Sequence, residues 1–150
     1  MKRWLFPILV ALCIITDQAA KYWAAGALKS GQVPLFGGAV MLNLTSNTGG
    51  AFGILPASPA FFTIAGALVF LIMMVFIKKI IRLPYIYQAG LAFVGGGAVG
   101  NLIDRLKMGY VIDFIDLKFW PVFNLADSYI TIGVLIMAYL FLTDKRREED

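Results

Sequence analysis

The stretch N-L-I-D-R-L-K-M-G-Y-V-I-D-F-I-D-L-K-F-W-P-V-F-N-L-A-D, residues 101–127, joins two apolar segments that are each long enough to cross a membrane. It holds four of the nine acidic residues of the chain: Asp104, Asp113, Asp116 and Asp127. Carboxyl groups that gather in an otherwise apolar protein are costly to bury, so this stretch is the first candidate for a functional site.

The composition of the whole chain is that of an integral membrane protein. Of its 150 residues, 60 % are apolar and 15 % are charged, whereas soluble domains average about a half and a quarter. A helix needs ~20 residues to cross a hydrocarbon core of ~30 Å. Four apolar segments have this length, at about 4–25, 58–77, 85–106 and 124–142.

We therefore predict an all-α membrane protein with four transmembrane helices and one domain, residues 1–150. Between the first two spans, residues 26–56 are rich in glycine and turn residues, and V-P-L-F-G-G-A-V-M-L-N-L-T reads as short extended segments. These residues are expected to form a small extracytoplasmic β platform.

The first apolar segment also resembles a secretory signal peptide, because it follows a basic start and contains V-A-L-C, a weak lipobox pattern ending at Cys13. A lipobox has a small residue before its cysteine, but Leu12 stands there, and the apolar pattern continues to about Ala25. We predict a retained transmembrane helix.

Basic residues predict the orientation of the spans. They gather near the N-terminus, in the turn at 78–82 and in the tail at 144–150. The positive-inside rule places these three regions, and hence both termini, in the cytoplasm. The platform and the 107–123 loop then share the outer face. Topology accounts for the net charge of +4, so no nucleic-acid partner is expected.

Asp17 and Lys21 lie four residues apart in the first span, on one face of a helix and in the favourable order for an ion pair. They are predicted towards the outer end of the helix. A charge at this depth costs about 2.5 kcal/mol or more, so a functional role is favoured over simple packing.

The third span is predicted to lie in the middle of the bundle. Gly96 and Gly100 form a G-x-x-x-G pair, which lets neighbouring helices approach closely. At its outer end Asn101 and Arg105 share a face, and Asp104 is expected to form an interfacial charge pair with Arg105.

The chain has no histidine, which excludes Ser-His-Asp and Cys-His catalysis and removes the commonest zinc ligand. Two carboxyl groups held close together share a proton, and one can then act as a base towards water while the other acts as an acid. Asp127 shares a helix face with Asn124 at the start of the fourth span. Its partner is either Asp113 or Asp116. If both lie on one strand, their side chains point to opposite faces of it.

Other functions fit the residues less well. A Ser/Lys dyad needs a serine near Lys21, and Ser128, Ser46 and Ser30 carry no supporting motif. A carboxylate metal site lacks the expected spacings, so no metal or cofactor is expected. A channel or carrier would place polar residues across the membrane, whereas here they cluster at one end.

Five motifs together resemble the bacterial lipoprotein signal peptidases, the type II enzymes. They are D-Q-A-A-K at 17–21, N-T-G-G-A-F at 47–52, G-N-L-I-D-R at 100–105, G-Y-V-I-D-F at 109–114 and F-N-L-A-D at 123–127. The motifs occur in order over nearly the whole chain. The departure from the family is Gly50, where another small residue is frequent.

The resemblance implies an aspartic endopeptidase of the bacterial cytoplasmic (inner) membrane, with its site near the outer face. It implies Asp113 and Asp127 as the catalytic pair. The supporting residues that it implies are Asp17, Lys21, Asn47, Gly49, Asn101, Arg105 and Asn124.

The substrate implied by the family is a prolipoprotein whose cysteine carries diacylglycerol, cut on the N-terminal side of that cysteine. Such a substrate keeps its scissile bond at the membrane surface. Membrane lipids are the other expected partners, and a monomer is expected.

Overall fold

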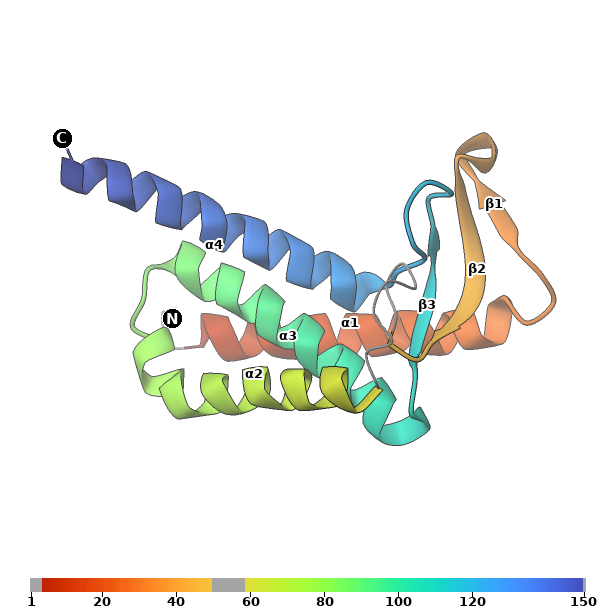
Figure 1. Ribbon diagram of the computed structural model, residues 1–150, viewed down its shortest axis with the longest axis horizontal. Coiled ribbons are helices and arrows are strands. Elements are labelled where there is room, and N and C mark those ends of the chain that lie inside the picture. The colour runs from red at the N-terminus through yellow and green to blue at the C-terminus, as the bar shows by residue number, and fades with distance from the viewer. Residues whose placement is uncertain (1–3, 50–58, 150) are drawn as a thin grey trace.

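The computed structural model describes residues 4–49 and 59–149. Within them lie four long helices, α1 (Leu5–Ala27), α2 (Pro59–Ile80), α3 (Tyr85–Met108) and α4 (Leu125–Glu149), each with a stretch long and apolar enough to cross a membrane. The helices run along the long axis of the molecule, and a small sheet crosses one end of them (Figure 1).

The helices begin within one residue of the predicted spans, and α1, α2 and α3 end two or three residues later than predicted. The largest difference is in α4, which was expected to end near Leu142 but continues to Glu149. The charged tail ends the apolar stretch without ending the helix, because Lys, Arg and Glu are good helix formers. The predicted first residue of the second span, Ser58, lies outside the described residues.

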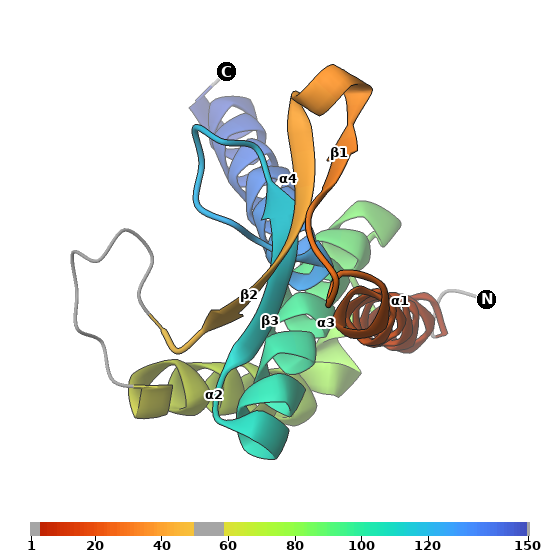
Figure 2. The same ribbon diagram turned by 90° about the vertical axis from the view of Figure 1, so that its right-hand side faces the viewer.

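Helix α3 lies in the middle of the bundle and packs against α1, α2 and α4 (Figure 2), which confirms the prediction from its glycines. Gly96 and Gly100 face α1. A Cβ atom at Gly96 would lie 2.5 Å from Cβ of Cys13, and one at Gly100 would lie 2.6 Å from Oδ2 of Asp17. Asp17 therefore reaches the centre of the bundle only because α3 has no side chain there.

Gly97 makes the corresponding contact with α4, since a Cβ atom there would overlap the backbone carbonyl of Ala126. We expect Gly97→Ala to push α4 away and to lower the free energy of unfolding by about 1–3 kcal/mol, the usual cost of overpacking. The matched control is Gly26→Ala, where a Cβ atom meets nothing within 4 Å. Thermal unfolding of the two variants in detergent measures the difference, and equal midpoints would contradict the packing argument.

The sheet has three antiparallel strands in the order β1 (Val33–Leu35), β2 (Val40–Asn47) and β3 (Val111–Asp116). A 3-10 turn, η1 (Phe36–Gly38), connects β1 to β2. The predicted β platform therefore recruits a third strand from the loop between α3 and α4.

Pairing of β2 with β3 brings two distant parts of the chain together. Thr45 pairs with Asp113 and Asn47 with Val111, beyond a register shift between Leu42 and Thr45. On β3, the buried Phe114 packs against α1 near Ala24, in a small apolar cluster under the sheet. This packing holds the strand that carries Asp113 against the helices.

Candidate active site

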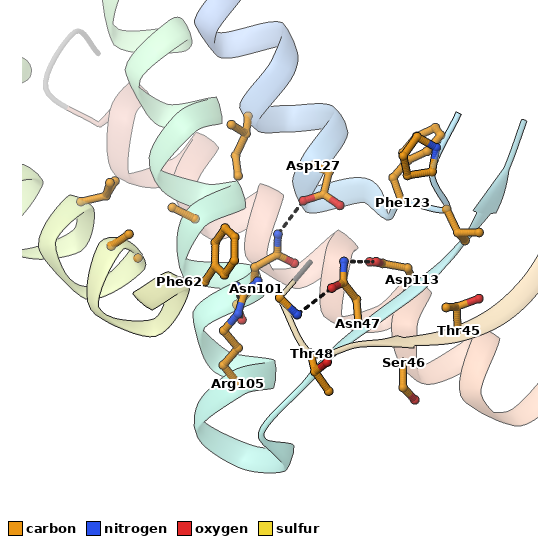
Figure 3. Close-up of a pocket in the computed structure, with 18 of the residues that line it drawn as sticks. Thr45, Ser46, Asn47, Thr48, Phe62, Asn101, Arg105, Asp113, Phe123 and Asp127 are labelled. Carbon is orange, nitrogen blue, oxygen red and sulfur yellow. Dashed lines mark hydrogen bonds between the residues drawn. The ribbon is translucent and has the colours of Figure 1, made fainter. Parts of the chain in front are cut away.

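Asp113 and Asp127 line the same cavity, of about 730 Å³, between the sheet and the ends of α2, α3 and α4. Asp113 comes from the middle of β3 and Asp127 from the first turn of α4 (Figure 3). Only 1 % of the Asp113 surface is exposed. The fold thus brings into one cavity two carboxyl groups that lie fourteen residues apart in the sequence.

Side-chain amides hold both carboxyl groups. Asp113 accepts hydrogen bonds from Nδ2 of Asn124 at 2.6 Å and from Nδ2 of Asn47 at 2.9 Å. Asp127 accepts one from Nδ2 of Asn101 at 2.8 Å. Amide donors thus fix the orientation of both carboxyl groups.

Asn124 caps the N-terminus of α4 and thereby fixes Asp127. Its Oδ1 accepts the backbone N–H of Asp127 at 2.9 Å, and its own backbone N–H points to Oδ2 of Asp127 at 3.4 Å. This reciprocal i, i+3 pattern is that of a capping box. The N-terminus of a helix carries partial positive charge and has free N–H groups, so it is a favourable position for an aspartate side chain.

The orientation of the Asn101 amide is set by the donors that bind its oxygen. Its Oδ1 accepts hydrogen bonds from Nζ of Lys21 at 2.9 Å and from Nδ2 of Asn124 at 3.1 Å. With its oxygen held by these donors, Asn101 can only present its NH₂ group to Asp127. Lys21 is therefore linked to Asp127 through one amide.

Lys21 is the cation of a buried triad. Its Nζ lies 2.8 Å from Oδ2 of Asp17 and 2.9 Å from Oδ2 of Asp104, and all three side chains are at most 3 % exposed. The predicted ion pair between Asp17 and Lys21 is thus present. Asp17 also accepts the backbone N–H of Ala126 at 2.9 Å, which ties the start of α4 to α1.

The predicted partner and place of Asp104 were wrong, although its role is structural as expected. Asp104 was expected to pair with Arg105 at the interface, but it is buried, pairs with Lys21 and accepts the backbone N–H of Ile112 at 3.2 Å. Neighbouring residues on a helix point about 100° apart, so Asp104 turns towards α1 while Arg105 turns into the cavity. Asp104 thereby anchors β3 one residue before Asp113.

Sequence reasoning missed Gln18 altogether. Its Nε2 donates to Oδ1 of Asp104 at 2.8 Å and to the backbone carbonyl of Gly100 at 3.2 Å. The available signal was its position next to Asp17, inside an apolar span where a second polar side chain needs a partner.

Asn47 reaches Asp113 from the last position of β2. Its Oδ1 accepts the backbone N–H of Gly49 at 2.8 Å, so Nδ2 faces Asp113. Gly49 has a φ of +118°, a backbone conformation that side chains disfavour. The remainder of the N-T-G-G-A-F motif, including Gly50, lies outside the described residues.

Asp116, the alternative partner for Asp127, does not line the cavity. It ends β3, where its Oδ1 accepts the backbone N–H of Lys118 at 2.7 Å. The two carboxyl groups of β3 are thus separated as strand alternation predicts, and only Asp113 shares a cavity with Asp127.

Lys21 and Ser128, which a Ser/Lys dyad would need, both bond to other groups. Nζ of Lys21 contacts three acceptors, and the hydroxyl of Ser128 donates to the backbone carbonyl of Asn124 at 3.1 Å. Among the side chains described in residues 4–49 and 59–143, no three from Asp, Glu and Cys gather closely enough to hold a metal ion.

The pKa of the Asp113 carboxyl is raised to about 6, mainly by burial and also by the nearby Asp127, while hydrogen bonds from Asn47 and Asn124 oppose the rise. An unfolded aspartate has a pKa of ~3.9, so between about pH 4 and pH 6 the native state binds more protons than the unfolded state. The free energy of unfolding must therefore fall as pH rises through this window.

We expect this titration to cost about 3 kcal/mol of stability by pH 7, at 1.36 kcal/mol for each pKa unit. Asp113→Asn has no such titration. Its unfolding midpoint, relative to that of the unsubstituted protein, should therefore be higher at pH 7 than at pH 4. Thermal unfolding in detergent at the two pH values measures the gain. Parallel pH curves would contradict the assignment of the raised pKa to Asp113.

Comparison with known proteins gives a consistent result. The family model described as signal peptidase (SPase) II matches residues 9–143. A lipoprotein signal peptidase of Caldanaerobacter subterraneus subsp. tengcongensis is 42 % identical over 139 residues, which cover 90 % of this chain and 94 % of the relative. One of Caldicellulosiruptor bescii is 39 % identical, with coverage of 94 % and 93 %.

Two solved structures, each described as a bacterial membrane enzyme determined by the in meso method, share the fold. One has a TM-score of 0.82 at 31 % identity and covers 93 % of this chain and 88 % of its own, and the other has a TM-score of 0.79 at 32 % identity with 93 % of both chains covered. The chain therefore belongs to the signal peptidase II family, multi-pass membrane proteases of the aspartic type that remove signal peptides from prolipoproteins.

Proposed function

We propose that Asp113 and Asp127 form the catalytic pair of this protease and that a water molecule is the nucleophile. The observation that supports the proposal is the shared cavity, in which each carboxyl group is oriented by a side-chain amide. Asp127, at the N-terminus of α4, is suited to be the ionised base. Asp113, with its pKa raised to about 6, is suited to carry the shared proton.

The reaction then runs in two steps. Asp127 takes a proton from water as the water oxygen bonds to the scissile carbonyl carbon, and Asp113 gives its proton to the carbonyl oxygen. In the second step the C–N bond breaks, the leaving nitrogen takes the proton from Asp127, and the hydroxyl proton returns to Asp113. Both carboxyl groups end in the state in which they began.

The substrate that we propose is a prolipoprotein with a diacylglyceryl cysteine, cut on the N-terminal side of that cysteine. Beneath the two aspartates the cavity is lined by apolar residues of the three surrounding helices, among them Val69, Val94 and Ile130. A lipid anchor can stay among these residues while the peptide lies next to the carboxyl groups.

The proposed setting is the bacterial inner membrane with both termini in the cytoplasm. Lys78, Lys79 and Arg82 lie where α2 turns into α3, at the end of the bundle opposite to the sheet (Figure 1). By the positive-inside rule that end is cytoplasmic, which puts the sheet and the cavity on the outer face. We further propose one domain, acting as a monomer among membrane lipids.

The test is cleavage by the purified protein in detergent. A prolipoprotein peptide carrying diacylglyceryl cysteine should be cut before that cysteine, as read by mass spectrometry, and the same peptide without lipid should remain intact. Failure to cut the lipidated peptide, together with solute flux in liposomes, would favour the channel or carrier alternative.

A further inference from the structure

Arg105 has unused hydrogen-bonding capacity at the cavity. A guanidinium has five N–H donors. Among the side chains described in residues 4–49 and 59–143, the hydrogen bond found for Arg105 is a long one, from Nη1 to the backbone carbonyl of Asn101 at 3.5 Å, and its buried Nε has no partner. The ion pairs found there for Asp17 and Asp104 go to Lys21. Arg105 is thus equipped to bind a further acceptor.

An aromatic ring supports the guanidinium from the neighbouring helix. Cζ of Arg105 lies 5.2 Å from the ring centroid of Phe62 on α2, within the range of a cation–π contact. Figure 3 shows the two side chains next to each other at the edge of the cavity. The N–H groups of a guanidinium lie in its own plane, so an oxygen ligand can approach them from the edge while the ring contacts the cation.

Along α3 the lining of the cavity changes from polar to apolar with distance from the sheet. Towards the sheet lie polar groups, including Asp113 and Asn47. Away from the sheet, at ~1.5 Å per residue, Asn101, which holds Asp127, lies about 6 Å from Arg105 along the helix. The apolar Ala98 and Val94 follow at about 10 Å and 16 Å.

The electrostatics favour a neutral ligand oxygen. Asp113 and Asp127 line the same cavity as Arg105, and ionised carboxyl groups would repel a phosphate or another anion. A carbonyl oxygen has no charge to repel, yet still gains a charge-assisted hydrogen bond from arginine. In a glyceride, ester carbonyls stand where the acyl chains meet the polar part of the molecule.

We propose that Arg105, held on Phe62, binds an ester carbonyl of the diacylglyceryl group, and that this contact makes the enzyme select ester-linked lipid. The inference rests on the proposed function, since it places the acyl chains in the apolar part of the cavity and the scissile bond beside the aspartates. Phe62 is then a positioning residue that acts through Arg105.

The test compares two substrates with the same peptide and the same chain lengths, one with ester-linked and one with ether-linked chains. Ether-linked chains lack the carbonyl oxygens. In nanodiscs the unsubstituted protein should cleave the ester form with a kcat/KM about ten-fold higher than the ether form, because the ether form lacks a hydrogen bond to the charged Arg105. The difference should lie in KM, since this hydrogen bond is present in the ground state and in the transition state alike. Arg105→Gln and Phe62→Leu should each bring the ratio close to one.

Phe70→Leu is the matched control, because Phe70 lies on α2 but is 45 % exposed and is not among the residues that line the cavity. It should keep the ten-fold preference. Equal cleavage of both substrates by the unsubstituted protein would overturn the ester contact alone, whereas cleavage of neither would overturn the proposed function itself. If Arg105→Gln slowed both substrates equally and left the preference intact, Arg105 would hold the peptide and the proposal would be wrong.

Discussion

Asp113→Asn and Asp127→Asn are each expected to reduce cleavage of a lipidated prolipoprotein by about 10³-fold or more, because an amide can neither accept nor return the proton that the reaction moves. The side chains keep nearly the same size, and the helix cap at Asn124 can still form. The measurement is single-turnover cleavage with each purified variant, together with its thermal unfolding midpoint to show that it is folded.

Asp116→Asn is the matched control for this experiment, since it makes the same change on the same strand outside the cavity. Its activity should stay within a few-fold of that of the unsubstituted protein, because a surface substitution rarely changes stability by more than about 0.5 kcal/mol. Full activity in either Asp113→Asn or Asp127→Asn would refute the catalytic pair. Loss of activity in Asp116→Asn would indicate that Asp116, and not Asp113, is the catalytic residue of the strand.

Lys21→Met is expected to lower the free energy of unfolding by about 3–5 kcal/mol, because the buried carboxylates of Asp17 and Asp104 lose the cation that pairs with them. At about 2–4 °C for each kcal/mol, the midpoint of thermal unfolding should fall by roughly 10 °C. Activity should fall as well, since Asn101 loses one of the two donors that hold its oxygen away from Asp127.

A combined variant separates the two effects. Adding Asp17→Asn and Asp104→Asn to Lys21→Met removes the stranded charges, so the unfolding midpoint should recover in part while the activity does not. Lys29→Met serves as the control, because Lys29 is exposed and its substitution should change neither quantity. A Lys21→Met protein that unfolds at the unsubstituted temperature would show that the triad contributes no stability.

The local features of the site could be predicted from the sequence. The i, i+4 spacing of Asp17 and Lys21 predicts their ion pair, and the i, i+3 spacing of Asn124 and Asp127 predicts a shared helix face. Gly96 predicts the central place of α3. Each of these depends on helix periodicity, which a sequence displays directly.

Contacts between distant segments could not be predicted in the same way. The donors on Asp113 come from Asn47 and Asn124, and that geometry depends on how β2 pairs with β3, beyond a register shift near Thr45. A slip of one residue would turn every side chain of a strand to the other face. Spacing alone therefore left Asp116 as an alternative.

The sequence by itself determined four membrane-crossing segments, a polar cluster at one end of them and a chemistry without histidine. Only the tertiary structure decided which polar groups meet. It turned Asp104 towards Lys21 and Arg105 towards the cavity, and it placed Phe62 against that arginine. The physical reason is that hydrophobic and helical periodicities are encoded locally, whereas the partner of a buried charge depends on how closely packed helices approach one another.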